Sequence, residues 1–139
     1  MAIALDEARL AMQSGEVPVG AVLIDDEGGV VVRAHNLCER ETDATAHAEM
    51  LAIREAEKRL SRWRLTGCTL YVTLEPCCMC AGAIGWAQVS RVVFGAHDPK
   101  RGFGRLAPNA LHPKCTVSSD ILADECMEKI QQFFQQKRL

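Results

Sequence analysis

The sequence predicts a three-layer α/β protein in which a central mixed sheet is covered by helices on both faces. Segments with a helical spacing of apolar residues alternate with short apolar runs bounded by turn residues, which is typical of this class. The chain has 139 residues, a length that suits one hydrophobic core, so we expect a single domain over residues 1-139. The predicted order is helix, strand, strand, helix, strand, helix, strand, a weaker strand and a last helix.

The first half of the chain contains two predicted helices on either side of a hairpin. Apolar residues at positions 5, 8 and 12 follow a helical period that ends at Gly15 and Pro18. The apolar runs 19–24 and 30–32 flank an acidic, glycine-containing turn, so we expect a buried hairpin there. Apolar residues at positions 50, 53, 56 and 60 then predict a helix that begins at or near His47.

The second half of the chain repeats the alternation of strand and helix. The run 69–74 predicts a strand that leads directly into Pro76, and apolar positions 81, 84 and 87 predict a helix after it. A short strand at 91–94, a loop that contains Asp98 and the glycines at 102 and 104, and a weaker strand at 116–118 follow. Apolar positions 123, 127, 130 and 134 predict the last helix.

Composition and charge narrow the possible functions. A hydrophobic content of 48% with 24% charged residues is typical of a globular protein, and a net charge of −2 argues against binding nucleic acid over a broad surface by charge alone. We find no secretion signal and no membrane span, and we expect a cytoplasmic protein without disulfides. A local basic patch remains possible, with the candidates Lys100, Arg101, Arg105, Lys137 and Arg138.

Two short motifs, thirty positions apart, carry the strongest functional signal. His47-Ala48-Glu49 offers an imidazole and a carboxylate, and Cys77 and Cys80 offer two thiols at the spacing Cys-x-x-Cys. One imidazole and two thiolates fill three positions of a tetrahedral Zn²⁺ and leave the fourth for water. Zinc lowers the pKa of such a water from about 15.7 toward about 7, and a carboxylate such as Glu49 can then move its proton. The sequence therefore predicts a catalytic zinc site.

The predicted helices set two geometric expectations for this site. If Pro76 opens the second helix, Cys77 and Cys80 lie three residues apart on one face, near the positive N-terminal end that favours thiolates. His47 and Glu49 are only two residues apart and would point to opposite sides of a regular helix. They can share a site only if the first turn of their helix is not fully helical.

Other interpretations of the motifs remain open from the residues alone. A Cys-x-x-Cys pair after a strand is also typical of a thioredoxin-like dithiol oxidoreductase, which would need neither zinc nor Glu49. A structural zinc knuckle would need a second ligand pair, which the sequence does not supply. We expect Trp63 and Trp86 to be core residues rather than base-stacking residues. The remaining single cysteines are expected to be small buried apolar residues: Cys38, Cys68, Cys115 and Cys126.

Five segments spread over nearly the whole chain carry a resemblance to a known family. They read EVPVGA at 16–21, TAHAE at 45–49, LYVTLEPC at 70–77, MCAGA at 79–83 and LADEC at 122–126. Together they resemble the tRNA-specific adenosine deaminases of the zinc-dependent cytidine deaminase superfamily, whose signature joins His-x-Glu to Pro-Cys-x-x-Cys. The segment 102–117 departs from the pattern that many members show, with GRL at 104–106 and HPKC at 112–115.

The resemblance assigns roles to particular residues. It implies that His47, Cys77 and Cys80 hold Zn²⁺ and that Glu49 is the proton shuttle. For Asn36, which resembles a base-contacting asparagine, spacing alone equally allows a turn-capping role. The residues that the resemblance places in contact with the substrate are Asn36, Ala48, Pro76, Asp98, Lys100, Phe134 and Arg138.

The resemblance also implies a fold, a partner and a reaction. It implies a cytidine-deaminase-like fold, a homodimer, and hydrolytic deamination of the wobble adenosine in a tRNA anticodon loop to inosine. An anticodon loop is physically sensible because its splayed bases can enter a pocket that a duplex base cannot reach. The alternative is a deaminase of guanine or another free nucleobase, because the segment 82–87 also resembles guanine deaminases.

Overall fold

The sheet that organises the molecule has five strands in the order β2-β1-β3-β4-β5. The computed structural model describes residues 1–137 of the chain. The strands are β1 (Gly20–Ile24), β2 (Val30–His35), β3 (Thr69–Leu74), β4 (Arg91–Ala96) and β5 (Thr116–Ser118). β1 pairs antiparallel with β2 and β3, whereas β4 is parallel to β3 and β5. The predicted mixed sheet is confirmed, and so is the weaker strand at 116–118.

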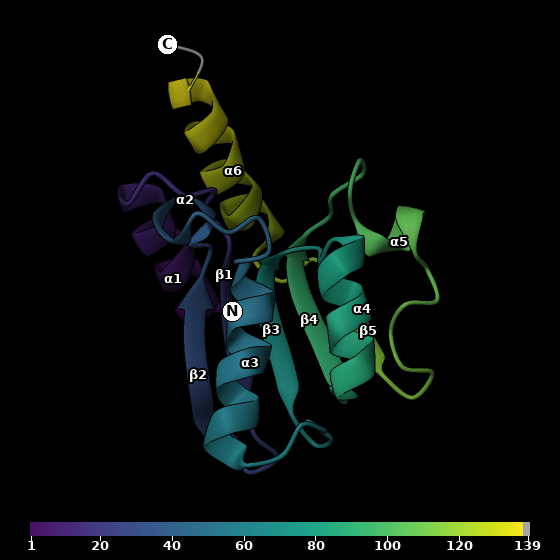
Figure 1. Ribbon diagram of the computed structural model, residues 1–139. Helices are drawn as coiled ribbons and strands as arrows, with labels where there is room; N and C mark the ends of the chain where they lie inside the picture. The colour runs from purple at the N-terminus through teal and green to yellow at the C-terminus, as the bar shows by residue number, and fades with distance from the viewer. Residues whose placement is uncertain (138–139) are drawn as a thin grey trace.

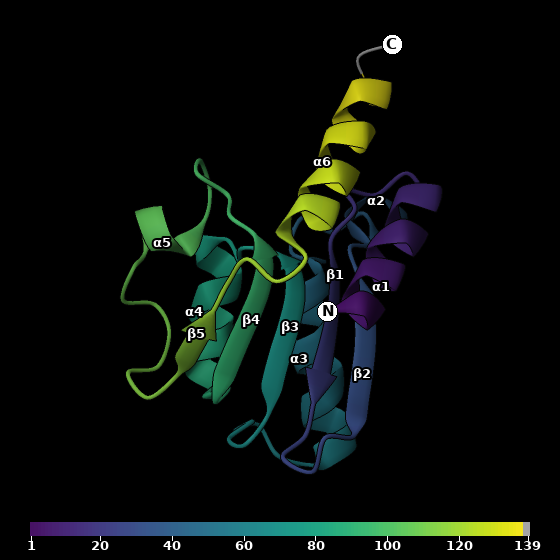
Figure 2. The same ribbon diagram turned by 180° about the vertical axis from the view of Figure 1, so that it is seen from behind.

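Helices cover both faces of this sheet, as Figures 1 and 2 show from opposite sides. The longer helices are α1 (Ala2–Gln13), α3 (Ala48–Leu60), α4 (Cys78–Ala87) and α6 (Ala123–Lys137). α3 and α4 lie on the face turned to the viewer in Figure 1, and α1 and α6 lie on the face turned to the viewer in Figure 2. The three-layer architecture is therefore confirmed. Among the described residues, no helix combines the length and apolar character needed to cross a membrane.

The central strands form the core. Leu23 in β1 and Leu70 and Val72 in β3 are fully buried, since helices cover both faces of the sheet at these strands. The predicted buried hairpin is correct for β1 but wrong for β2. β2 is an edge strand with a single neighbour, and Val30 at its start is 49% exposed.

The start of α4 differs from the prediction. The helix begins at Cys78 with Cys77 as its N-cap residue, so Pro76 does not open it. The backbone stays extended at Cys77 because the Pro76 carbonyl accepts a hydrogen bond from the Phe103 N–H at 2.9 Å, and Cys77 forms a β-bridge with Gly102. Cys77 therefore precedes the helix, while Cys80 is its third residue.

Two short helices were not predicted: α2 (Cys38–Glu41) and α5 (Phe103–Leu106), the second within a segment predicted to be loop. Four residues are too few to show a helical period, and a contact distant in sequence holds α2 in place. The buried Glu16 carboxylate accepts hydrogen bonds from the N–H groups of Glu39 and Arg40, at 3.0 and 2.8 Å. This is a helix cap supplied from another part of the chain.

Side-chain burial corrects two further expectations. Trp63 and Trp86 are 54% and 83% exposed, so the prediction that they are core residues is wrong. Trp63 lies in the connection between α3 and β3, and Trp86 lies near the end of α4. Of the single cysteines, Cys68 and Cys126 are buried as predicted, whereas Cys38 and Cys115 are only half-buried.

Candidate metal centre

The two sequence motifs meet at the edge of the sheet where β3 and β4 end and where α3 and α4 begin (Figure 1). His47 is the N-cap residue of α3, and Cys77 is the N-cap residue of α4. The Nδ1 atom of His47 lies 3.6 Å from Sγ of Cys77 and 3.5 Å from Sγ of Cys80. Three ligating groups from two separate helix starts therefore converge on one point.

The spacing of these atoms fits a tetrahedral zinc ion. With Zn–S near 2.3 Å and Zn–N near 2.0 Å, a tetrahedral angle places nitrogen and sulfur about 3.5 Å apart. The two measured distances agree with that value, and the three ligand atoms all lie within 4.8 Å of one another. Three protein ligands leave one coordination position for water, as in catalytic zinc sites.

The electrostatics of the cluster favour a dication. Hydrogen bonds from Cys80 and His47 lower the pKa of Cys77 to about 4, although burial opposes this shift. The pKa of Cys80 is raised by its hydrogen bond to Cys77 and by burial, so one proton is held between the two sulfurs. Zinc binds deprotonated thiols, and its two positive charges would take the place of that proton.

Glu49 lies beside this cluster as the second residue of α3 and is 3% exposed. The expected conflict between positions 47 and 49 is resolved by the backbone, because His47 is extended (φ −73°, ψ 151°) and the helix starts after it. Burial raises the pKa of Glu49 to about 7. A carboxyl group with that pKa can both accept and donate a proton near neutral pH.

A cavity of about 460 Å³ opens over the cluster. Glu49, His47 and Cys77 lie in its wall, and Asn36, Asp98 and Arg101 line its sides. Its size allows a nucleobase to enter, since ligand pockets begin at roughly 300 Å³.

Asn36 connects the cavity wall to the metal cluster. Its Oδ1 accepts a hydrogen bond of 2.7 Å from the N–H of Ala48, the first residue of α3, and the residue is 7% exposed. Asn36 therefore caps the start of a helix that is distant in sequence, rather than a local turn. The Nδ2 amide donates to none of the described residues, so the same side chain has a donor left to offer a substrate.

The other residues expected to contact substrate have different surroundings. Asp98 lines the cavity, but Lys100 is exposed outside it, and Arg101 takes the place that the resemblance gave to the lysine. Ala48 and Pro76 are buried, and neither lines the cavity. The sequence indicates Arg101 only as part of a basic cluster, because which of several loop cations lines the cavity depends on loop conformation.

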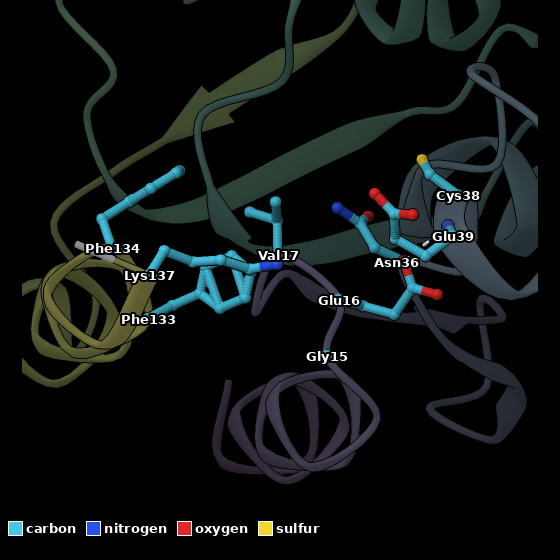
Figure 3. A pocket seen from close by; sticks show the side chains of 9 residues that line it. All are labelled: Gly15, Glu16, Val17, Asn36, Cys38, Glu39, Phe133, Phe134 and Lys137. Atoms are coloured by element: carbon cyan, nitrogen blue, oxygen red, sulfur yellow. Dashed lines mark hydrogen bonds between the residues drawn. The ribbon is translucent and has the colours of Figure 1, made fainter. Parts of the chain in front are cut away.

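A second cavity, of about 260 Å³, adjoins the first and shares Val17, Asn36 and Cys38 with it. Figure 3 shows Phe133, Phe134 and Lys137 of α6 facing the Asn36 side of this cavity across Val17. The expected role of Phe134 beside the substrate is compatible with this position. Arg138 lies outside the described residues.

The fold and the cluster define a zinc-dependent deaminase. Residues 1–96 match the family model described as the cytidine and deoxycytidylate deaminase zinc-binding region. The chain therefore belongs to this family, Zn²⁺ is its cofactor, and the dithiol oxidoreductase alternative is wrong.

Within the family, the chain belongs with the tRNA-specific adenosine deaminases. It is 49% identical over 140 residues to the tRNA-specific adenosine deaminase of Bacillus subtilis (strain 168), across 97% of this chain and 86% of that protein. A solved structure of a tRNA:A34 deaminase is 44% identical, with a TM-score of 0.86, over 93% of this chain and 96% of that one. The guanine deaminase of Bacillus subtilis is 40% identical, but over 68% of this chain and 60% of that one, with a TM-score of 0.64.

Proposed function

We propose that this protein hydrolyses the wobble adenosine of a tRNA anticodon loop to inosine and ammonia. The observation that carries the reaction class is the buried Glu49 beside a three-ligand cluster at the wall of a base-sized cavity. The substrate is supported by the near full-length similarity to tRNA-specific adenosine deaminases.

In this proposal His47, Cys77 and Cys80 hold the zinc, which when bound supplies an activated water for attack on the adenine ring. A C–O bond forms at the ring carbon that carries the amino group, and the C–N bond to that group breaks. Glu49 accepts one proton from the attacking water and delivers it to the neighbouring ring nitrogen. It then takes the second proton from the new hydroxyl group, which becomes the carbonyl, and delivers it to the departing amine. Its burial supports this role, because a pKa near 7 lets one group perform both transfers.

The sides of the cavity support recognition of a nucleotide rather than of a bare ring. The Asn36 amide faces the cavity with a free donor, and Arg101 is the one lysine or arginine among the described residues that lines it. A guanidinium beside a base pocket can bind a phosphate of the RNA backbone. Asp98 and Asn36 offer further polar contacts to base or ribose.

The proposal is tested by inosine formation in an arginine tRNA anticodon stem-loop that carries a wobble adenosine. We expect the wild-type protein to form inosine, and Glu49→Gln to keep one zinc per chain and lose at least 99% of turnover, in line with roughly 10²-fold or larger losses of a proton-transfer group. Glu57→Gln, two turns further along α3 and outside the cavity, is the matched control and should retain turnover. Full activity of Glu49→Gln would show that the proton shuttle is assigned to the wrong residue.

The second candidate is deamination of free guanine, which the similarity to a guanine deaminase structure favours. Ammonia release from guanine, without inosine in the stem-loop, would retain the zinc chemistry and move the substrate to a free base. Guanine is therefore assayed beside the RNA.

We also propose that the protein is a cytoplasmic homodimer, as its resemblance to tRNA-modifying enzymes implies. Trp86 on α4 is 83% exposed beside a groove of about 470 Å³ formed with Ala110, Leu111 and Pro113. An exposed aromatic side chain beside an apolar groove is typical of a protein interface. Trp86→Glu should shift the dimer toward monomer in sedimentation, and an unchanged dimer would place the interface elsewhere.

A further inference from the structure

A second buried carboxylate near the metal centre, Glu75, has no part in the proton transfers described above. It is 8% exposed and lies between β3 and Pro76, two residues before Cys77. Its Oε1 accepts a hydrogen bond from the N–H of Asp98, and its Oε2 accepts one from the N–H of Gly104, both at 2.9 Å. One carboxylate thus holds both ends of the segment 98–104.

The segment 98–104, which we name the cavity loop, is built closely around this carboxylate. A Cβ atom at position 102 would collide with the carboxyl carbon of Glu75, so the loop packs against the carboxylate at a distance that only glycine permits. Within the loop, Oδ1 of Asp98 accepts hydrogen bonds from the N–H groups of Lys100 and Arg101, both at 3.1 Å. Glu75 and Asp98 together therefore fix the loop backbone.

The cavity loop carries two of the polar side chains that line the cavity, whose wall also includes Glu75. Asp98 and Arg101 line the cavity over the metal cluster, whereas Lys100 does not. The loop is also tied to the residues that precede α4, because the Phe103 N–H donates to the Pro76 carbonyl and Cys77 forms a β-bridge with Gly102. Glu75 is thus placed to set the position of the loop relative to the metal ligands.

We propose that Glu75 is a positioning residue for substrate binding, which acts by holding the cavity loop so that Arg101 reaches an RNA phosphate beside the deaminated base. This inference rests on the proposed function. The mechanism is one of preorganisation: the loop is fixed before the RNA arrives, so binding does not have to order it. Removing the negative charge of Glu75 would by itself favour RNA binding, so weaker binding in its absence cannot be a simple charge effect.

The test uses the zinc-loaded protein, the stem-loop RNA, and the variants Glu75→Gln, Arg101→Gln and the double variant. Glutamine keeps one acceptor oxygen but turns an NH₂ group toward the second loop N–H, so one of the two bonds is lost. We expect Glu75→Gln to raise KM for the RNA about tenfold, in line with the loss of one charge-assisted hydrogen bond, with a smaller change in kcat and unchanged zinc content. Arg101→Gln should raise KM similarly, and the double variant should add little to either.

The dependence of KM on salt concentration separates the loss of one RNA phosphate contact from a general disturbance of the fold. Loss of one phosphate contact lowers the slope of log KM against log salt by about 0.7 for a single-stranded RNA. Both single variants should show this loss, and the double variant should show it only once. Glu7→Gln is the matched control: Glu7 is also 8% exposed and bound to His35 and Arg33, but it lies on α1 on the other face of the sheet. It should leave KM and the slope unchanged.

Amide hydrogen exchange of the cavity loop gives a second reading that needs no substrate. In Glu75→Gln, the amide hydrogens of Asp98 and Gly104 should exchange with solvent faster than in the wild type. If the glutamine variant does not fold, the milder Glu75→Asp is used in its place. Unchanged KM and exchange in a folded variant would overturn the inference. Additive KM effects of Glu75→Gln and Arg101→Gln would also overturn it. If the wild type formed no inosine, the proposed function would be contradicted. Hydrogen exchange would then still test whether the cavity loop depends on Glu75.

Discussion

Asn36 offers the sharpest separation of a structural role from a substrate role, because its two amide atoms face different partners. Oδ1 caps the N–H of Ala48 at 2.7 Å, while Nδ2 is free to meet the substrate. Asn36→Ala removes both functions. Asn36→Asp keeps an acceptor for the Ala48 N–H and replaces the donor in the cavity by a second acceptor.

The magnitude of the structural effect follows from burial. Ala48 is fully buried, so Asn36→Ala leaves an unsatisfied N–H at the first residue of α3, which costs about 1–3 kcal/mol. For a domain of this size, about 2 kcal/mol corresponds to a fall in Tm of roughly 6 °C. Asn36→Asp keeps an acceptor for the Ala48 N–H, so it should lose less stability than Asn36→Ala.

Urea unfolding of the zinc-loaded variants, combined with steady-state kinetics on the stem-loop RNA, measures both effects. We expect Asn36→Ala to lose stability and kcat/KM together, and Asn36→Asp to lose about tenfold or more in kcat/KM alone, since a donor to the base is gone. Wild-type activity in Asn36→Asp would refute the substrate contact. Wild-type stability in Asn36→Ala would refute the capping argument.

Three further predictions concern the buried groups around the site and the core. Glu49 has a pKa of about 7 in the folded, zinc-free protein against an ordinary 4.5, so the folded state binds more protons and stability falls as pH rises from about 4.5 to 7. Glu49→Gln should flatten this decline when the zinc-free protein is unfolded by urea at several pH values, and an unchanged pH profile would contradict the burial argument. Cys80→Ala should lose both zinc, measured by metal analysis, and turnover on the stem-loop RNA. The control Cys126→Ala removes a buried thiol outside the cluster and should keep both. Zinc retained at full stoichiometry in Cys80→Ala would remove Cys80 from the ligand set. Gly20→Ala should lower the free energy of unfolding by more than about 3 kcal/mol, because the alanine Cβ would overlap the Ala4 carbonyl where α1 packs on β1. A loss of stability below about 1 kcal/mol would show that α1 can shift freely.

The fold was predictable where local pattern and tertiary burial agree. Strands β3 and β5 match their predicted residues, and the long helices follow the apolar periods, because each element buries one continuous apolar surface. The two helices that were not predicted have a common cause. The short helices α2 and α5 depend on contacts made by distant parts of the chain, such as the cap that Glu16 supplies, and no local pattern encodes such a contact.

The site was predictable as chemistry but not as geometry. Ligand types and spacing indicated zinc, and the expected irregularity between His47 and Glu49 is present as an N-cap. The start of α4 was misplaced at Pro76 because the pairing of Cys77 with Gly102 is not visible in the sequence. The position of Arg101 rather than Lys100 at the cavity, and the hydrogen bonds that Glu75 makes to the loop, depend on loop conformation in the same way.

The central claim is that the cavity over the metal cluster acts on an adenosine held in RNA. The most direct measurement gives the zinc-loaded protein an equimolar mixture of the wobble-adenosine stem-loop and free guanine, and follows inosine and xanthine together by mass spectrometry. The account predicts inosine at the wobble position, with xanthine no higher than in a Glu49→Gln blank. Xanthine without inosine would contradict it.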